Sequence, residues 1–226
     1  MEDPMSLEGS MTLREALRQQ RPPVHSNLTP DPSDLPDPEN EEDDPRFNWQ
    51  LVENVSRWDE FNLTNLENGY GRLLDQNFTP NTVVPQPQQE LGHVVIINQP
   101  EDINHLIRWN HRLMNLTLDF SKSHLRIHPH RVLRHECTIA GVRVVVPPIE
   151  RRVQSDVDHV ISLASPLDNT PAEILVTGIG KPSSEFSMRS VANDVRALNE
   201  DNLWAIKELA HSCYNAKTRY GYVCKP

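Results

Sequence analysis

Two stretches of the chain decide the fold that the sequence predicts: Asp156-Val-Asp158-His-Val-Ile-Ser-Leu163 and Glu173-Ile-Leu-Val-Thr-Gly-Ile179-Gly-Lys181-Pro182. Both contain apolar, β-branched runs of strand length, and a turn rich in Pro, Asp and Asn separates them. An acid on one strand, beside a second strand that ends in acid-x-Lys, is the arrangement that holds a divalent cation next to an attacking water. In this chain Ile179 occupies the position of the second acid.

The chemistry of phosphodiester hydrolysis shows why this replacement matters. The cation polarises the phosphate and lowers the pKa of its bound water, and a pair of carboxylates is the usual minimum for holding it. Lys181 lies two residues after position 179 and points to the same strand face, where an ammonium offsets charge that grows on the phosphate. The side chain of Ile179 cannot bind a metal. The sequence therefore predicts a weakened or inactive cation site.

The stretch from Asp156 to Lys181 resembles the corresponding stretch of fungal proteins that carry a PD-(D/E)XK nuclease-like domain. Two further stretches carry the resemblance: Gly180-Lys-Pro-Ser-Ser-Glu-Phe186, similar to the family's loop after its lysine, and Ala216-Lys-Thr-Arg-Tyr-Gly-Tyr-Val223, similar to the strand after its long helix. The resemblance implies a restriction-endonuclease-like fold from about residue 90 onward. It also implies that Asp158 is the first metal ligand, Ile179 replaces the lost second ligand, and Lys181 is the catalytic lysine. Relatives continue beyond this strand, so the chain is expected to be truncated at its C-terminus.

Two other acids are candidates for a Mg²⁺ site. Asp156 shares a strand face with Asp158, so either could serve as the first ligand. Glu185, in the loop after Lys181, is the candidate to replace the missing acid. Mg²⁺ is the expected cofactor if the chain is active, and none is expected otherwise. The alternative for Asp158 is a salt bridge to a residue such as Arg151 or Arg152, and Lys181 could also pair with Asp158.

Composition divides the chain into three parts. Residues 1–46 hold 12 acidic and 4 basic residues and are rich in proline, so they contribute −8 of the net charge of −10. Such a segment buries too little apolar surface to offset its ordering entropy, and we expect it to be a disordered tail. Residues 47–89 are expected to form a helical or irregular extension, and residues 90–226 the nuclease-like domain.

Apolar periodicity predicts an α/β (α+β) domain with a mixed central sheet flanked by helices. Helices are predicted over residues 101–115, 187–198 and 201–216, the last with Leu203, Ile206, Ala210 and Cys213 facing inward. Strands are predicted around a turn in residues 137–146 and over residues 157–163, 173–178 and 219–224. The order helix, three strands, helix, strand is the αβββαβ core that the resemblance implies. Further helices are predicted over residues 11–19 and 48–61.

A basic stretch from residue 122 to residue 152 is the candidate nucleic-acid-binding surface. Its cationic residues are Lys122, Arg126, Arg131, Arg134, Arg143, Arg151 and Arg152. The same stretch holds histidines and a thiol (His124, His128, His130, His135 and Cys137), which suggest zinc. Their spacing matches no common zinc module, so solvated or packed histidines are the favoured interpretation.

Four aromatic residues near the C-terminus have two interpretations. Trp204, Tyr214, Tyr220 and Tyr222 could form a stacking platform for bases. We favour core packing, because aromatic residues at helical and strand periods ordinarily fill the interior.

Cysteine usage and the N-terminus indicate the compartment. The 3 cysteines form neither a disulfide framework nor a zinc pattern, and Met1-Glu-Asp-Pro4 does not resemble a signal peptide. No apolar run is long enough to cross a membrane. We therefore expect a nuclear or cytoplasmic protein that is not secreted and has no membrane partner.

Together these features predict a nuclease-like domain protein with a weakened or inactive site that retains binding to DNA or RNA. The first alternative is a protein-interaction module, or a fragment of a larger fungal protein, that recruits protein partners through its acidic tail. The second alternative is an active Mg²⁺-dependent nuclease with a displaced acid.

Overall fold

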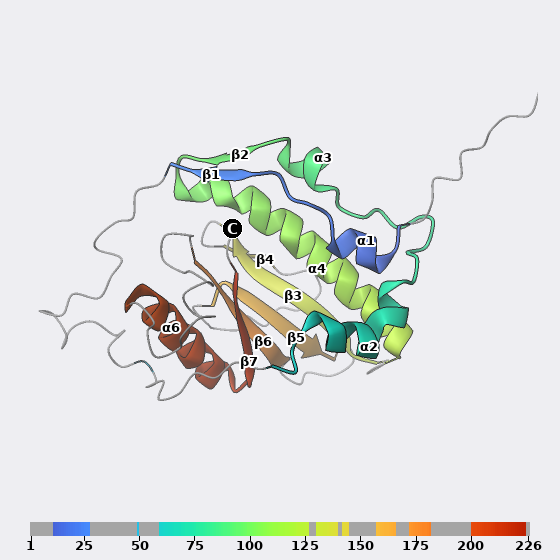
Figure 1. Ribbon diagram of the computed structural model, residues 1–226. Helices are drawn as coiled ribbons and strands as arrows, with labels where there is room; N and C mark the ends of the chain where they lie inside the picture. The colour runs from blue at the N-terminus through green and yellow to red at the C-terminus, as the bar shows by residue number, and fades with distance from the viewer. Residues whose placement is uncertain are drawn as a thin grey trace, which may run out of the picture.

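The computed structural model describes residues 11–27, 49, 59–126, 130–139, 142–144, 157–165, 172–181 and 200–224. Within them, a five-stranded sheet lies beside two long helices, α4 (Asn104–Leu125) and α6 (Glu200–Ala216). Figure 1 shows a further layer of N-terminal elements on the side of α4 away from the sheet. The fold is therefore mixed α/β, as the sequence predicts.

The sheet combines antiparallel and parallel strands. Its members, in the spatial order β4-β3-β5-β6-β7, are β4 (Val142–Val144), β3 (Val132–Ile139), β5 (His159–Ala164), β6 (Glu173–Gly180) and β7 (Tyr220–Cys224). The first four strands of this order pair antiparallel, whereas β7 runs parallel to β6. The strands predicted over residues 157–163, 173–178 and 219–224 are confirmed to within two residues at each end. Strand β3 begins five residues before the predicted start at residue 137.

The helix predicted over residues 101–115 is present but longer. A 3₁₀ turn, η4 (Pro100–Ile103), precedes α4, and α4 continues to Leu125. The helix ends there because Arg126 adopts a left-handed conformation with φ of 53°. The predictions for residues 48–61 and 187–198 fall mostly or wholly outside the described residues.

The inward face of α6 differs from the predicted one near its start, whereas Cys213 faces the sheet as predicted, with its Sγ atom 3.2 Å from the Thr177 hydroxyl. Asn202 and Ala205 are the buried residues near its start, and Leu209 packs against the sheet. Leu203 and Ile206 are only partly buried. The inward stripe is therefore rotated by about one residue, because a polar residue, Asn202, takes a buried position that a pattern of apolar residues cannot reveal.

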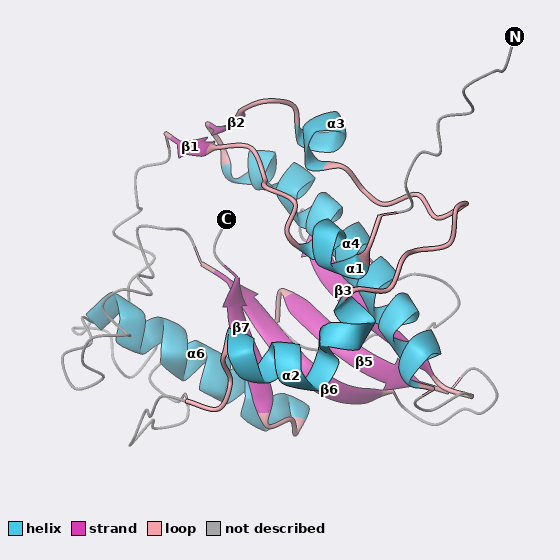
Figure 2. Cartoon of the chain, turned by 45° about the vertical axis from the view of Figure 1, so that its right-hand side comes forward, coloured by secondary structure: helices cyan, strands magenta, loops and turns pink. Residues whose placement is uncertain are grey.

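The N-terminal layer includes residues that were expected to be disordered. It comprises α1 (Leu13–Leu17), β1 (Val24–Ser26), α3 (Pro87–Leu91) and β2 (Val95–Ile97), whereas Figure 1 shows α2 (Leu63–Leu74) below α4, at the level of the sheet. Strand β1 pairs in parallel with β2, and Figure 2 shows the two at one end of the molecule. The expectation of disorder is therefore wrong for residues 11–27, whereas the predicted helix at residues 11–19 is confirmed.

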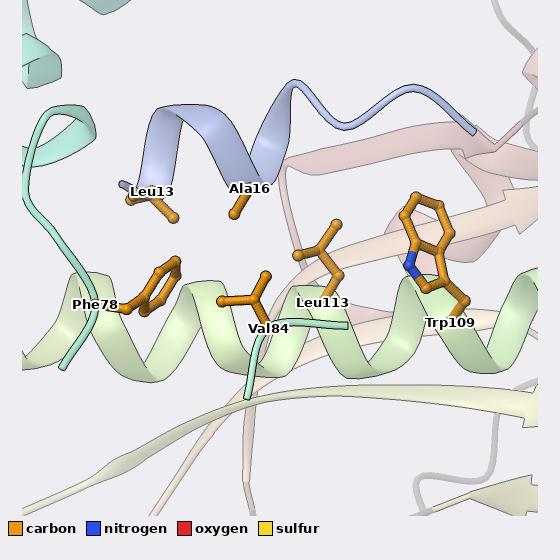
Figure 3. Packing of buried hydrophobic residues seen from close by; sticks show 6 residues of the cluster. All are labelled: Leu13, Ala16, Phe78, Val84, Trp109 and Leu113. Carbon is orange, nitrogen blue, oxygen red and sulfur yellow. The ribbon is translucent and has the colours of Figure 1, made fainter. Parts of the chain in front are cut away.

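An apolar core joins α1 to α4 (Figure 3). Its buried members are Leu13, Ala16, Phe78, Val84, Trp109 and Leu113. A five-residue helix is not stable alone in water, so this burial and a capping box between Thr12 and Glu15 stabilise α1. The Trp109 indole N–H donates to the Pro85 carbonyl at 3.3 Å, which satisfies the polar group of the buried ring.

Asn115 of α4 provides a hydrogen-bonding partner for the backbone of β3. Its side-chain amide donates to the His135 carbonyl at 3.0 Å, and its side-chain oxygen accepts from the His135 N–H at 2.9 Å. Among the described residues, β4 pairs with Cys137–Ile139, and at His135 the amide of Asn115 acts where a neighbouring strand would act. This double contact holds α4 beside β3.

Imidazole rings and a tyrosine fill the space between α4 and the sheet. The His111 and His135 Nδ1 atoms are 3.1 Å apart, and the rings of His135 and His159 stack with centroids 5.3 Å apart. The Tyr222 hydroxyl lies 3.3 Å from His135 Nε2, and its ring lies over Gly178. Burial lowers the pKa of His111, which favours its neutral form in the layer.

Replacing Asn115 tests the contact between α4 and β3. In Asn115→Ala the His135 peptide loses both of these hydrogen bonds, and we expect the free energy of unfolding to fall by about 2 kcal/mol or more. Urea denaturation measures the change. The control Asn215→Ala removes an exposed amide from α6 and should change stability by less than about 0.5 kcal/mol. Equal effects in the two variants would contradict the role of Asn115.

A pair of glycine substitutions tests the tyrosine–histidine layer. A Cβ atom at Gly178 would lie 2.5 Å from the Tyr222 ring, so Gly178→Ala must displace this ring and should destabilise the protein by about 2 kcal/mol. A Cβ atom at Gly69, inside α2, meets no atom within 4 Å. Gly69→Ala should therefore stabilise the protein by about 0.5 to 1 kcal/mol, because alanine favours the helix. Thermal unfolding should show shifts of opposite sign.

Candidate functional site

Asp158 lies directly before β5, beside the end of β6. The antiparallel register pairs His159 with Gly178, which brings the start of β5 to the end of β6. The Asp158 carboxylate accepts a hydrogen bond from the Gly180 N–H at 2.7 Å. Gly180 immediately precedes Lys181, so the structure brings together the two segments that the sequence predicts to form the site.

Lys181 forms an ion pair with an acid that the sequence analysis did not single out. Its Nζ atom is 2.6 Å from a carboxylate oxygen of Glu208, in the middle of α6. The two side chains are 22% and 25% exposed, so the pair is shielded from much of the solvent. No local motif marks Glu208, because its contact with Lys181 arises only when α6 packs on β6.

Ile179 lies under α6 and is 1% exposed. It packs with Val157 and Val160, and Leu209 of α6 lies against the same cluster. Neighbouring residues of a strand point to opposite faces, so Ile179 faces α6 whereas Gly178 faces Tyr222 and the histidine layer. The position of the expected second acid is therefore part of the apolar packing between β6 and α6.

Several predicted site residues fall outside the described part of the chain. They are Asp156, Glu185, Arg151 and Arg152. Arg143 lies in β4, opposite Thr138 of β3. The proposed replacement of the second acid by Glu185 and the proposed salt bridge of Asp158 with Arg151 or Arg152 stay predictions.

The remaining predicted cations gather at the other end of the sheet. Lys122 and Arg126 lie at the end of α4, and Arg131 pairs with Glu173 at the start of β6, 3.1 Å away. Arg134 and Lys122 lie near Asp119 of α4. Burial raises the pKa of Asp119, and the positive charges of these two residues lower it. Glu173 and Gly180 are separated by roughly 20 Å of strand at ~3.3 Å per residue. The cations therefore lie away from Asp158 and Lys181.

The histidines do not gather into a metal site in the described residues. His135 is completely buried and packs against other rings, whereas His124 and His130 are exposed. Within these parts of the chain, no group of three or more His, Cys, Asp or Glu residues could hold a metal ion. His128 lies outside the described residues.

The aromatic residues divide into two classes. Tyr222 packs in the histidine layer, and Trp204 lies beside Trp49, with ring centroids 6.0 Å apart. Tyr214 and Tyr220 are 66% and 55% exposed. The prediction of core packing is therefore wrong for these two tyrosines. Tyr214 follows Cys213, which faces the sheet, and Tyr220 begins the edge strand β7.

A surface hollow of about 360 Å³ lies in the N-terminal layer. It is lined by Glu90, Leu91, Val94, Val95, Ile96, Asn98, Asp102 and His105. None of these residues belongs to the Asp158–Lys181 region. The hollow is therefore a separate feature.

The described helices include none with the length and apolarity needed to cross a membrane.

Comparison with protein-family models, curated proteins and solved structures finds no match for the chain.

A double-mutant cycle tests the geometry around Lys181. The Lys181→Met and Glu208→Gln substitutions should show a coupling energy of about 1 to 2 kcal/mol, because the ion pair is close and partly shielded. The more exposed and longer pair between Arg18 and Glu67, at 3.6 Å, is the matched control and should give less than about 0.5 kcal/mol. Chemical denaturation of the single and double variants measures both couplings. A zero coupling for Lys181 and Glu208 would show that α6 does not hold this lysine.

Proposed function

We propose that this chain is a nuclease-like domain of the PD-(D/E)XK type that binds nucleic acid and has lost efficient cleavage. The observation that carries the proposal is the hydrogen bond from the Gly180 N–H to the Asp158 carboxylate. It places an acid beside the strand end that bears Ile179 and Lys181. The order α4, β3, β5, β6, α6, β7 supports the same proposal, with β4 as an additional edge strand.

Among the residues that the structure describes, those around Lys181 do not fit a complete Mg²⁺ site. Mg²⁺ requires hard oxygen ligands in near-octahedral geometry. Asp158 supplies one carboxylate, but the acid that reaches Lys181 is Glu208, and it is engaged in the ion pair. Ile179 fills the remaining position with an apolar side chain. We therefore assign no cleavage step to this site and propose binding as its surviving activity.

Cations at the end of α4 and the start of β3 support the proposal of nucleic-acid binding. The described members of the predicted set there are Lys122, Arg126, Arg131 and Arg134. Such a group attracts phosphates and releases counterions, so binding should weaken as salt rises. DNA or RNA is the proposed partner, in the nucleus or cytoplasm.

A protein-interaction module is the second candidate. Val94, just before β2, and Ile96 of β2 are both about half exposed, and they line the hollow in the N-terminal layer. Exposed apolar side chains beside a hollow suit a protein partner. Absence of binding to any nucleic acid at low salt would favour this candidate over the first.

A cleavage and binding assay on the same protein tests the first candidate. We expect the wild type to bind single- or double-stranded DNA or RNA at low salt, to lose affinity as salt rises, and to cleave slowly or not at all with Mg²⁺. Ile179→Glu should raise Mg²⁺-dependent cleavage by about ten-fold or more, because it restores an acid next to Asp158 and Lys181.

The control for Ile179→Glu must account for the burial of residue 179. Val160→Glu places the same carboxylate in the same apolar cluster without restoring the acid-x-Lys order, so it should cost similar stability and give no cleavage. Circular dichroism checks that both variants are folded. Efficient cleavage by the wild type, abolished in Glu208→Gln, would instead support an active nuclease in which Glu208 is the displaced acid. If the wild type shows no salt-sensitive binding to DNA or RNA, the proposal is rejected whatever the variants do.

A further inference from the structure

The turn between α6 and β7 presents two aromatic rings to solvent. Tyr214 lies in the last turn of α6 and is 66% exposed, and Tyr220 begins β7 and is 55% exposed. We refer to residues 214–220 as the tyrosine turn. Large aromatic side chains usually bury most of their surface, so two exposed rings near one short turn mark it as a contact surface. Tyr220 shares a strand face with Tyr222, away from α6, whereas Tyr214 lies on α6, so the two rings flank the turn on opposite sides of the sheet.

Hydrogen bonds fix the backbone of the tyrosine turn. The Thr218 N–H donates to the Cys213 carbonyl at 3.0 Å, and Lys217 takes a left-handed conformation with φ of 55°. The Thr218 hydroxyl donates to the Leu175 carbonyl of β6. These contacts attach the turn to the sheet, so both tyrosines stand on a rigid support.

The tyrosine turn is cationic in an acidic protein. Lys217 and Arg219 lie between the tyrosines and are exposed. No acidic residue occurs in the sequence from Leu209 to Cys224, although the whole chain carries a net charge of −10. The turn is therefore a local site of positive charge that suits a polyanion.

We propose that the tyrosine turn binds single-stranded nucleic acid, with bases stacked on Tyr214 and Tyr220 and phosphates bound by Lys217 and Arg219. Stacking requires an open base face, which a single strand offers and a duplex hides. A protein partner could also use exposed tyrosines, but the two flanking cations and the lack of nearby acids in the sequence favour a phosphate backbone.

This binding surface is separate from the Asp158–Lys181 region. Strand β7 pairs Tyr220 with Val176 and Cys224 with Gly180, so the tyrosine turn lies toward the start of β6, whereas Asp158 contacts its end. Arg131 pairs with Glu173 at that same start of β6. The inference deepens the proposed nucleic-acid binding, and rests on it, by naming a single strand as the ligand.

Fluorescence anisotropy with labelled oligothymidine and oligouridine tests the inference. Removing both rings in Tyr214→Ala/Tyr220→Ala should weaken binding by about ten-fold or more, since stacking contributes ~1–3 kcal/mol per base. The Tyr214→Phe/Tyr220→Phe variant keeps both ring faces and should bind within about two-fold of the wild type. Lys217→Glu/Arg219→Glu should weaken binding and reduce its salt dependence.

Matched controls come from α2. Tyr70 is 50% exposed, and Arg72 is exposed on the same helix. Tyr70→Ala and Arg72→Glu should leave the affinity for oligothymidine unchanged. Equal weakening by these controls and by the turn variants would overturn the inference, because it would show a general loss of fold or charge.

The outcomes separate this inference from the proposed function. If the wild type binds oligonucleotides in a salt-sensitive way but the alanine variant binds equally well, the tyrosine turn is not the site and the proposed function stands. Tighter binding of duplex than of single strand, unaffected by the tyrosines, would lead to the same conclusion. If the wild type binds neither single strand nor duplex at low salt, the proposed function fails as well.

Discussion

The structure depends on the hydrogen bonds that the backbone groups at the edge of β3 make with α4. A strand peptide next to a helix needs a hydrogen-bonding partner, and Asn115 supplies both a donor and an acceptor to His135 from α4. This fixes α4 beside the sheet. The other side of α4 then buries Trp109 and Leu113 against α1, so the short N-terminal elements gain their stability from the same helix.

The two faces of the sheet have different chemistry as a result. The face toward α4 holds His135, His159 and Tyr222, where the Tyr222 hydroxyl lies within hydrogen-bonding distance of His135 and the His159 ring stacks on that of His135. The face toward α6 is apolar around Ile179 and polar at its border, where Lys181 meets Glu208. An acid at position 179 would have to ionise inside this apolar cluster, which is costly. Isoleucine at this position is therefore consistent with tight packing of α6 on β6.

Part of the candidate site was predictable from the sequence. Asp158 and Lys181 stand out because an acid at the start of one apolar strand and a lysine at the end of the next suit a cation site. Glu208 was not predictable in the same way, since its distance from Lys181 depends on the position of α6 across the sheet. The exposure of Tyr214 and Tyr220 could not be predicted either, because periodicity shows neither how α6 is rotated on the sheet nor that β7 is its edge strand.

The sequence by itself determined the type and order of the long elements, since the apolar repeats of β5, β6 and α6 match the geometry of strands and a helix. It did not predict α2, which contains Gly69 and Gly71 and buries none of its residues. Nor did it predict β1 and β2, which are three residues each and exist only as a pair. Tertiary structure alone decided these elements, the burial of Ile179 and the partner of Lys181, because each depends on contacts between residues far apart in the chain.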